Sequence, residues 1–407
     1  MEGIPYVMVM TVSVVMYKRL GISNTDIALY TSWLYLPWVI KPLWSPIVDI
    51  LKTKRFWIVG MQLVIGAALA GVALTIPGPA FFKWSLVFFW LIAFSSATHD
   101  IAADGFYMLA IDDSNQAWFV GIRSTFYRIA MIAGQGLLVM IAGQFETSMG
   151  DIAAAWSATI WITCGAFLLF MLYHRWALPR PASDVPTAEA TVQGVLKEFG
   201  ATFTSFFKKP AIGSAIAFFL FYRFSEAQLV KMASPFLLDS PEVGGLGLST
   251  TEVGFVYGTV GVVSLTLGGL LGGFMASRNG LKYWLWPMVA AINLPNLVYL
   301  LLAVFQPEST MLVNIAVGVE QFGYGFGFTA FMLFMIYAAD GPHKTAHFAI
   351  CTGFVALGMM LPGMASGWIQ EALGYQSFFI WILVATLPGF YVASRVKIDP
   401  LFGKADK

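Results

Sequence analysis

The sequence predicts an all-α membrane protein whose twelve transmembrane helices form two bundles of six. The first observation is composition: 58% of the 407 residues are hydrophobic and only 11% are charged, whereas soluble domains carry about 25% charged residues. The second is length, because spans of about 20 residues with short loops leave room for roughly twelve helices. The third is a polar stretch over residues 174–209, with six apolar stretches before it and six after it.

The apolar stretches place the spans along the chain. The first six are expected at about 1–17, 26–48, 56–76, 84–108, 117–143 and 152–173. The second six are expected at about 210–232, 249–276, 283–305, 312–339, 346–369 and 376–395. The domains predicted from these spans are an N-terminal bundle over 1–173, a cytoplasmic linker over 174–209, a C-terminal bundle over 210–395 and a cytoplasmic tail over 396–407. Within the linker, the amphipathic-looking run 192–207 predicts a surface helix.

The basic residues orient the chain in the membrane. With the N-terminus inside, fifteen of the 23 Lys and Arg residues fall in cytoplasmic segments. Only Lys18, Arg19 and Lys83 then fall in external loops. Cytoplasmic loops are rich in Lys and Arg, so both termini are predicted to be cytoplasmic.

Several classes of function are excluded by what the sequence lacks. The net charge of +1 indicates no nucleic-acid partner. No nucleotide-binding loop or zinc motif is present, so we expect no enzyme activity, no cofactor and no metal. Cys164 and Cys351 both lie in apolar segments and are expected to be free. The expected partners are a small-molecule substrate, protons and the lipid bilayer, and the protein is expected to be a monomer.

Two acids and two bases interrupt the fourth and fifth apolar stretches. Charges within a bilayer are costly and usually face a partner or a wet cavity. Asp100 and Asp104 are four residues apart, hence on one face of the fourth helix. The fifth helix runs in the opposite direction, so the depths of the residues predict the pairs Asp104–Arg123 and Asp100–Arg128. These pairs form either a permanent clamp near the cytoplasmic end or, at Arg128, a site for an anionic substrate.

The second half carries its own intramembrane charges. Arg223 and Glu226 are three residues apart and can pair on the seventh helix. Glu226 is a candidate proton-coupling site, because movement of the arginine would change the proton affinity of the carboxylate. Lys231 lies near the external end and either serves the site or extends to the interface. Glu320 has no basic neighbour in sequence, so it is either protonated or bonded between helices.

The remaining candidate residues are assigned by position and chemistry. Aromatic side chains can stack on sugar rings, and Asn293 lies beside Pro295 in a polar, kinked stretch that could line a cavity. Lys41 either contacts an acidic partner or extends to the membrane–water interface. Glu2 either has a role in the site or lies there only because it is near the start of the chain. The candidate substrate-binding residues are Arg128, Arg223, Tyr127, Tyr222, Trp38, Asn293 and Tyr324. The candidate proton-coupling residues are Asp100, Glu226 and Glu320. The candidate gating residues are Asp49, Asp104, Arg123, Lys41 and Arg278.

Two loops in corresponding places echo each other. Trp44-Ser-Pro-Ile-Val-Asp49 follows the second span, and Gly273-Phe-Met-Ala-Ser-Arg278-Asn-Gly-Leu-Lys282 follows the eighth. Both resemble the G-x-x-x-D-R-x-G-R-K loop of the major facilitator superfamily, although the first lacks the Gly and the second has Ser277 for the Asp. The resemblance implies alternating access between two halves with a site near the midplane, and a gating role for Asp49.

Longer segments resemble the AmpG family of muropeptide permeases. The matching segments are Lys41–Asp49, Ala93–Asp104, Tyr127–Arg128, Tyr222–Ala227, Glu320–Phe331 and Thr345–Ile350. Relatives of this family carry two further C-terminal helices, and His99 stands where a Gln is common. The resemblance implies a proton symporter in a bacterial inner membrane. Its cargo would be GlcNAc–anhydroMurNAc, with or without peptide, in peptidoglycan recycling.

Other functions stay open at this point. A related facilitator could carry an oligosaccharide, a siderophore or a coenzyme A ester, although five basic residues in the spans are few for a coenzyme A carrier. A receptor or enzyme subunit would have no need of paired gate-like loops. The intramembrane arginines are a poor fit for a multidrug exporter of cationic drugs.

Overall fold

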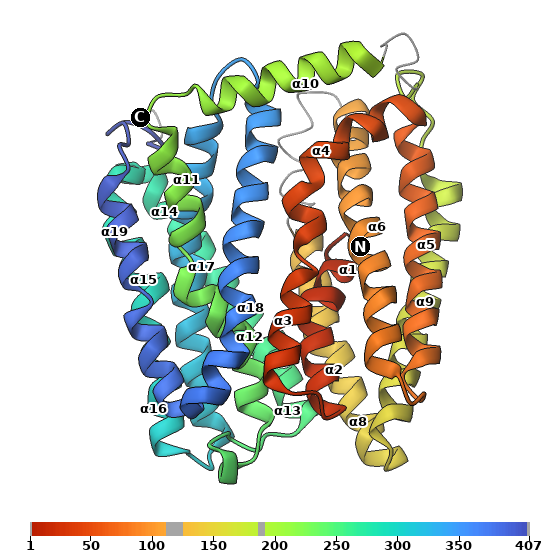
Figure 1. The fold of residues 1–407 in the computed structure, drawn as a ribbon, viewed down its shortest axis with the longest axis vertical. Coiled ribbons are helices and arrows are strands. Elements are labelled where there is room, and N and C mark those ends of the chain that lie inside the picture. Colours follow the sequence, from red (N-terminus) through yellow and green to blue (C-terminus); the bar gives the residue numbers. More distant parts are fainter. Residues whose placement is uncertain (1, 111–124, 186–191, 405–407) are drawn as a thin grey trace.

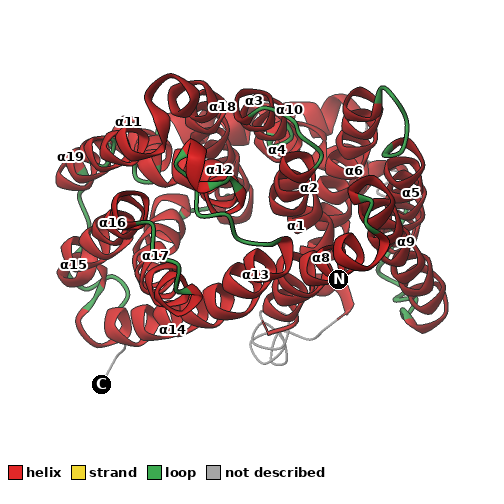
Figure 2. Ribbon diagram, turned by 90° about the horizontal axis from the view of Figure 1, so that it is seen from below, coloured by secondary structure: helices red, strands yellow, loops and turns green. Residues whose placement is uncertain are grey.

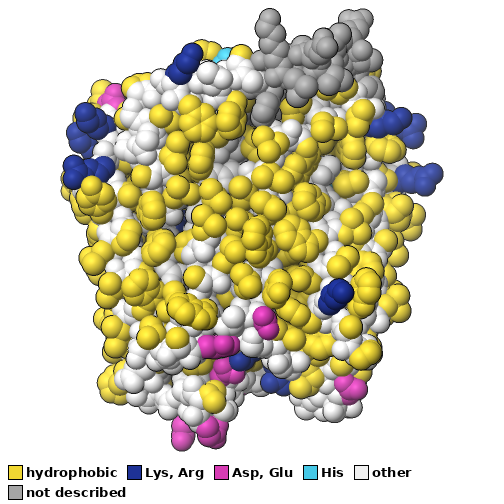
Figure 3. Space-filling view, viewed as in Figure 1, with side chains coloured by type: hydrophobic (Ala, Val, Ile, Leu, Met, Phe, Trp, Pro, Cys, Tyr) yellow, Lys and Arg dark blue, Asp and Glu magenta, His cyan; other side chains and the backbone are white. Residues whose placement is uncertain are grey.

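A computed structural model describes residues 2–110, 125–185 and 192–404, of which Asp49, Met108, Ala110 and 192–199 are described by backbone alone. The described residues contain helices and loops without a strand. Most helices run between the two ends of the molecule, and one lies across the end that also carries the C-terminus (Figure 1). Hydrophobic side chains cover most of the middle of the face in Figure 3, as expected of a surface against lipid.

The first six spans follow the predicted stretches. The elements of the first half are α1 (Gly3–Val7), η1 (Met8–Val12), α2 (Ser13–Arg19), α3 (Asn24–Trp33), α4 (Leu36–Leu51), α5 (Lys54–Thr75), α6 (Phe81–Ala110), a helical stretch at 125–131, η2 (Ile132–Leu138), α8 (Val139–Met149) and α9 (Ile152–Ala177). The fifth span ends at Met149, six residues beyond its predicted end at 143, and its predicted start lies outside the described residues.

The second half repeats this architecture after the linker helix α10 (Val192–Phe207), whose bounds match the predicted surface helix. Its elements are α11 (Ile212–Phe221), α12 (Phe224–Leu238), η3 (Pro241–Val243), α13 (Thr250–Phe255), η4 (Val256–Gly261), α14 (Val262–Asn279), α15 (Leu281–Asn293), η5 (Leu294–Asn296), α16 (Leu297–Phe305), α17 (Thr310–Ala339), α18 (Lys344–Val384) and α19 (Leu387–Arg395). Helix α18 holds the eleventh span and the first part of the twelfth, with a turn between them at Gly374, where φ is +73°. Helix α19 completes the twelfth span. The fold is therefore all-helical with twelve spans, as predicted.

Eight helices of the described residues are long and apolar enough to cross a membrane alone. Two other spans, the second and the seventh, are interrupted. The second span is interrupted between α3 and α4, just before Pro37, whose missing N–H suits the first turn of a helix. The seventh is interrupted at Arg223, whose φ of −109° and ψ of 23° are not helical. These breaks place Tyr35 and Arg223 where their side chains project between the halves.

The two halves lie side by side in the end-on view of Figure 2. They meet where α3 packs on α18 and where α8 packs on α13. The N-terminus lies at mid-height between the ends of the helices (Figure 1). The end with α10 carries the loops rich in Lys and Arg, so it is the cytoplasmic end. The domain boundaries predicted above stay a prediction.

The linker is tied to both halves. The carboxylate of Asp184 accepts hydrogen bonds from the backbone N–H groups of Lys54 (2.7 Å) and Arg55 (3.1 Å) at the start of α5. At the other end, Ser205 of α10 pairs with Nε2 of His347 at 2.9 Å. Lys209 donates to the carbonyl of Ala338 at the end of α17 at 2.7 Å. The linker therefore contacts the cytoplasmic ends of both bundles.

Candidate functional site

A cavity of about 540 Å³ lies between the two halves. This volume falls in the usual range of small-molecule sites, about 300–1,000 Å³. The first half contributes Glu2, Tyr6, Tyr35, Trp38, Lys41, Asp100, Asp104 and Tyr127 to its wall. The second half contributes Arg223 and one face of α18 with Thr352, Val355, Ala356 and Met359. The wall thus combines aromatic rings with acids and bases.

The acidic side of the cavity is built by α4 and α6. Asp100 Oδ2 accepts a hydrogen bond from Trp38 Nε1 at 3.2 Å. Asp104, one turn further along α6, also faces the cavity. Lys41 lies three residues from Trp38 on α4 and also lines the cavity. The ring of Tyr6 packs edge-on against Trp38, with centroids 5.3 Å apart.

The basic side is centred on Arg223. Its Nε and Nη2 donate to the two carboxylate oxygens of Glu226 at 2.6 and 3.1 Å, which confirms the predicted pair. Nη2 also donates to the hydroxyl of Tyr324 at 2.8 Å. The guanidinium lies 5.0 Å from the ring centroid of Phe328. Such bidentate and cation–π contacts fix the plane of the guanidinium at the cavity wall.

The predicted pairing of Arg128 with Asp100 was wrong. The guanidinium of Arg128 donates to Thr266 of α14 at 3.0 Å, while Asp100 is bonded to Trp38 instead. The predicted depths did not fix how each helix is rotated about its axis, and the 125–131 helix directs Arg128 toward the second half. Arg123 lies outside the described residues, so the predicted Asp104–Arg123 pair lies there too.

Three other predicted substrate-binding residues bond to protein groups and are not among the residues of the cavity wall. The hydroxyl of Tyr222 donates to the carbonyl of Gly327 at 2.9 Å, within the apolar core of the second half. Asn293 is 2% exposed and accepts from Ser225 at 3.1 Å. The hydroxyl of Tyr324 holds Arg223. Of the predicted aromatics, Trp38 and Tyr127 line the cavity, and their roles in binding stay a prediction.

Glu320 and Arg278 are not among the residues of the cavity wall. Glu320 is 4% exposed, accepts from Gln321 Nε2 at 2.9 Å and faces the hydroxyl of Tyr299. Arg278 stacks on the ring of Phe274, 4.7 Å from its centroid, at the cytoplasmic end of α14. The backbone of Asp49 lies in α4, and its side chain is not among those described. The proton-coupling and gating roles of these residues stay predictions.

Sequence reasoning missed part of the wall. Tyr6 and the α18 residues carry no charge that would mark them in an apolar chain. The spacing of Thr352, Val355, Ala356 and Met359 fits one helix face, but the same spacing is typical of packing. One alternative for Lys231 was that its side chain extends to the membrane–water interface. In the structure Lys231 is 1% exposed and bonds to Thr31 of the first half.

The external ends of the halves are joined by a polar ring that we call the outer lock. The ammonium of Lys18 pairs with Asp239 at 2.6 Å and donates to Asn24 at 2.9 Å. Tyr375 donates to Asp239 at 2.6 Å. Asn24 donates to Tyr375 at 3.0 Å and to Gln370 at 2.6 Å. Because Lys18 and Asn24 belong to the first half, the lock closes the external side of the interface.

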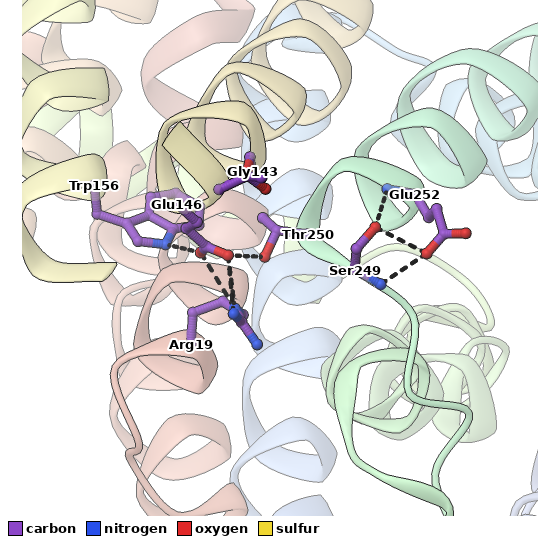
Figure 4. A network of polar contacts seen from close by, with 8 residues as sticks. Arg19, Gly143, Glu146, Trp156, Ser249, Thr250 and Glu252 are labelled. Carbon is purple, nitrogen blue, oxygen red and sulfur yellow. Dashed lines mark hydrogen bonds and ion pairs between the residues drawn. The ribbon is translucent and has the colours of Figure 1, made fainter. Parts of the chain in front are cut away.

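A second network reinforces this closure (Figure 4). Glu146 at the end of α8 pairs with Arg19 at 2.9 Å and accepts from Trp156 at 2.8 Å. It also accepts from Thr250 of the second half at 2.8 Å. Ser249 and Glu252 beside it form a capping box at the start of α13. The cavity is therefore shut from the external side in this structure.

Twelve spans in two halves, with a polar cavity between them that is closed on one side, define a secondary transporter of the alternating-access kind. The chain belongs to the Major Facilitator Superfamily, whose family model matches residues 3–348. It is accordingly a multi-pass membrane transporter of small molecules and not an enzyme.

Individual relatives are distant. The anhydromuropeptide permease of Escherichia coli K12 is 24% identical over 357 residues, covering 86% of this chain and 69% of that protein. This similarity confirms the predicted resemblance to muropeptide permeases. Among solved structures, the nucleoside transporter NupG matches with a TM-score of 0.66 at 16% identity, covering 98% of this chain and 97% of that one. An inward-facing, occupied bacterial homologue of the human lysosomal transporter Spinster matches with a TM-score of 0.67 at 18% identity, covering 97% and 95%. At these identities the structures show the fold alone.

Proposed function

We propose that this transporter imports GlcNAc–anhydroMurNAc, with or without its peptide, across a bacterial inner membrane together with protons. The observation that carries the proposal is the wall of the cavity, where aromatic rings, carboxylates and cations meet. The similarity to a protein named anhydromuropeptide permease supports the choice of cargo. The cargo's sugar rings, carboxylate and co-transported proton each find a matching group.

The aromatic residues suit the sugar rings. Tyr6, Tyr35, Trp38 and Tyr127 all face the cavity. Aromatic rings present apolar faces for the C–H surfaces of a sugar, while the Tyr hydroxyl and the Trp N–H can bond to its polar groups. A disaccharide with two N-acetyl groups uses both kinds of contact.

The basic residues suit the cargo's carboxylate. Arg223 and Lys41 lie on opposite halves of the cavity wall. A guanidinium binds a carboxylate through two parallel hydrogen bonds, and Arg223 already binds Glu226 in this way. A cargo carboxylate can therefore replace Glu226 once a proton neutralises that glutamate.

The acidic residues couple the proton to the cargo. Glu2, Asp100 and Asp104 share the described part of the wall with two bases. An anion is repelled by ionised carboxylates, so it binds better when some of them are protonated. By linkage, the anion then raises the affinity of the site for protons by the same factor. Asp100, held by Trp38 beside the cavity, is the best placed of the three for this role.

Uptake by the purified protein in liposomes tests the proposal. Labelled GlcNAc–anhydroMurNAc should accumulate when the outside is acidic, and Trp38→Leu should reduce its uptake. Trp176→Leu is the matched control, because Trp176 is 85% exposed at the end of α9, away from the cavity. Absence of uptake by folded wild-type protein would refute the cargo, and equal uptake by the two variants would refute the site.

A further inference from the structure

Lys231 is a buried cation that has no role in the transport proposed above. It lies on α12 in the second half and is 1% exposed. Its ammonium donates to the hydroxyl of Thr31 on α3 at 2.9 Å. It also lies 5.4 Å from the centroid of the Tyr35 ring. Both of these partners belong to the first half, so Lys231 spans the interface between the halves.

The partners of Lys231 are weak for a buried charge. Among the ion pairs of the described residues, none joins Lys231 to a carboxylate. A hydroxyl and a ring face recover only part of the hydration that an ammonium loses on burial. An apolar side chain would fill this interface at lower cost. The placement therefore indicates a group that gains a better partner in another state.

Position on α12 relates Lys231 to the cavity and to the outer lock. It lies eight residues from Arg223, about 12 Å nearer the external end of the helix. Asp239 of the outer lock lies another eight residues on. Tyr35 also lines the cavity, so the ring that contacts the ammonium is part of the cavity wall. Lys231 thus lies between the closed entrance and the basic side of the site.

Separation of the halves at the external end would uncover this ammonium. Thr31 and Tyr35 would leave with the first half, while Lys231 would stay with the second. The ammonium would then face the external opening, above Arg223 on the same helix. A cargo entering from outside would meet Lys231 before it met Arg223.

We propose that Lys231 binds the carboxylate of the cargo in the outward-open state and forms an outer anion subsite. This inference rests on the proposed function, because it requires an anionic cargo. The anion is held first by Lys231 and then by Arg223 deeper in the site. As the external ends of the halves close, Thr31 and Tyr35 replace the cargo carboxylate at Lys231. This replacement favours release of the cargo inward.

Initial rates of uptake from outside, in proteoliposomes of uniform orientation, test the subsite. The two probes are GlcNAc–anhydroMurNAc and its neutral derivative, in which the carboxylate is an amide. Loss of one hydrogen bond to a charged group weakens binding affinity by about tenfold or more. Lys231→Met should raise KM for the carboxylate probe by about tenfold and leave KM for the amide nearly unchanged. Lys231→Arg should keep KM near the wild-type value for both probes.

Control variants separate binding from folding. Thr31→Val removes the hydrogen bond to Lys231 but keeps the ammonium, so KM for the carboxylate probe should stay near wild type. If Lys231→Met does not fold, Lys231→Cys treated from outside with an aminoethyl methanethiosulfonate restores a cation at the same place. That treatment should lower KM for the carboxylate probe, whereas a neutral methyl reagent should not.

The outcomes distinguish the inference from the proposed function. If wild-type protein transports the probes but Lys231→Met leaves KM unchanged or raises it equally for both, the subsite is wrong and the function stands. Lack of charge rescue at Lys231→Cys would likewise overturn the subsite. If wild-type protein transports neither probe, the proposed function fails and the subsite fails with it.

Discussion

Asp239→Asn should weaken the outer lock and increase access to the interface from outside. The substitution keeps the shape of the side chain and its ability to accept from Tyr375, but it removes the charge that pairs with Lys18 at 2.6 Å. The two side chains are only 16% and 18% exposed, so water compensates the loss poorly. The closed state should therefore lose stability relative to the open state.

The size of the effect follows from the geometry. A hydrogen bond to a charged group contributes about 1.5–3 kcal/mol, and the remaining amide contact recovers part of it. A net loss of about 1–2 kcal/mol shifts the ratio of open to closed molecules by roughly 5- to 30-fold. The proportion of outward-open protein should rise by that factor.

Labelling of a buried cysteine measures this shift. Ser32 is fully buried at the interface on α3, behind the lock. In a Ser32→Cys background, a membrane-impermeant maleimide added outside should react roughly 5- to 30-fold faster when Asp239→Asn is present. Glu252→Gln is the matched control, because Glu252 bonds to Ser249 and Thr310 within its own half. An unchanged rate in Asp239→Asn, or an equal rise in the control, would refute the lock.

Two further predictions concern the basic side and the packing of the halves. Glu226→Gln leaves Arg223 without its carboxylate, which in buried pairs costs about 3 kcal/mol or more. It should reduce, but not abolish, stimulation of uptake by a pH gradient, because Asp100 stays in the cavity wall. Cargo exchange should continue, and wild-type stimulation would contradict the coupling role of Glu226. A Cβ at Gly258 would overlap the Cα of Gly136 across the interface, so Gly258→Ala should speed external labelling of the same cysteine. Gly273→Ala, where a Cβ meets open space, should leave the labelling rate unchanged, and equal rates in the two variants would contradict the packing argument.

The number and order of the spans could be predicted because bilayer thickness fixes the length of an apolar helix. The breaks within the membrane-spanning helices could not all be predicted from the sequence. Helix α4 runs through Pro42 and Pro46, whereas the chain breaks before Pro37. A helix can pass through proline when neighbouring helices compensate for the lost bond. Composition alone carries no information on which prolines are compensated.

The site was predictable where contacts are local in sequence. Arg223 and Glu226 pair as expected, because three residues along a helix place two side chains together. The expected contact between Asp100 and Arg128 failed, since membrane depth sets the height of a residue but not the rotation of its helix. Each residue turns the direction of the side chain by about 100°. Tertiary packing sets that rotation, and the sequence patterns do not encode it visibly.

Proton movement driven by cargo is the most direct test of the proposed symport. Proteoliposomes with equal pH on both sides and a pH-sensitive dye inside would receive unlabelled GlcNAc–anhydroMurNAc from outside. The cavity with its carboxylates and cations predicts acidification of the lumen that depends on the cargo and is absent from empty liposomes. Cargo uptake without acidification would contradict proton coupling, and absence of both would contradict the proposed transport.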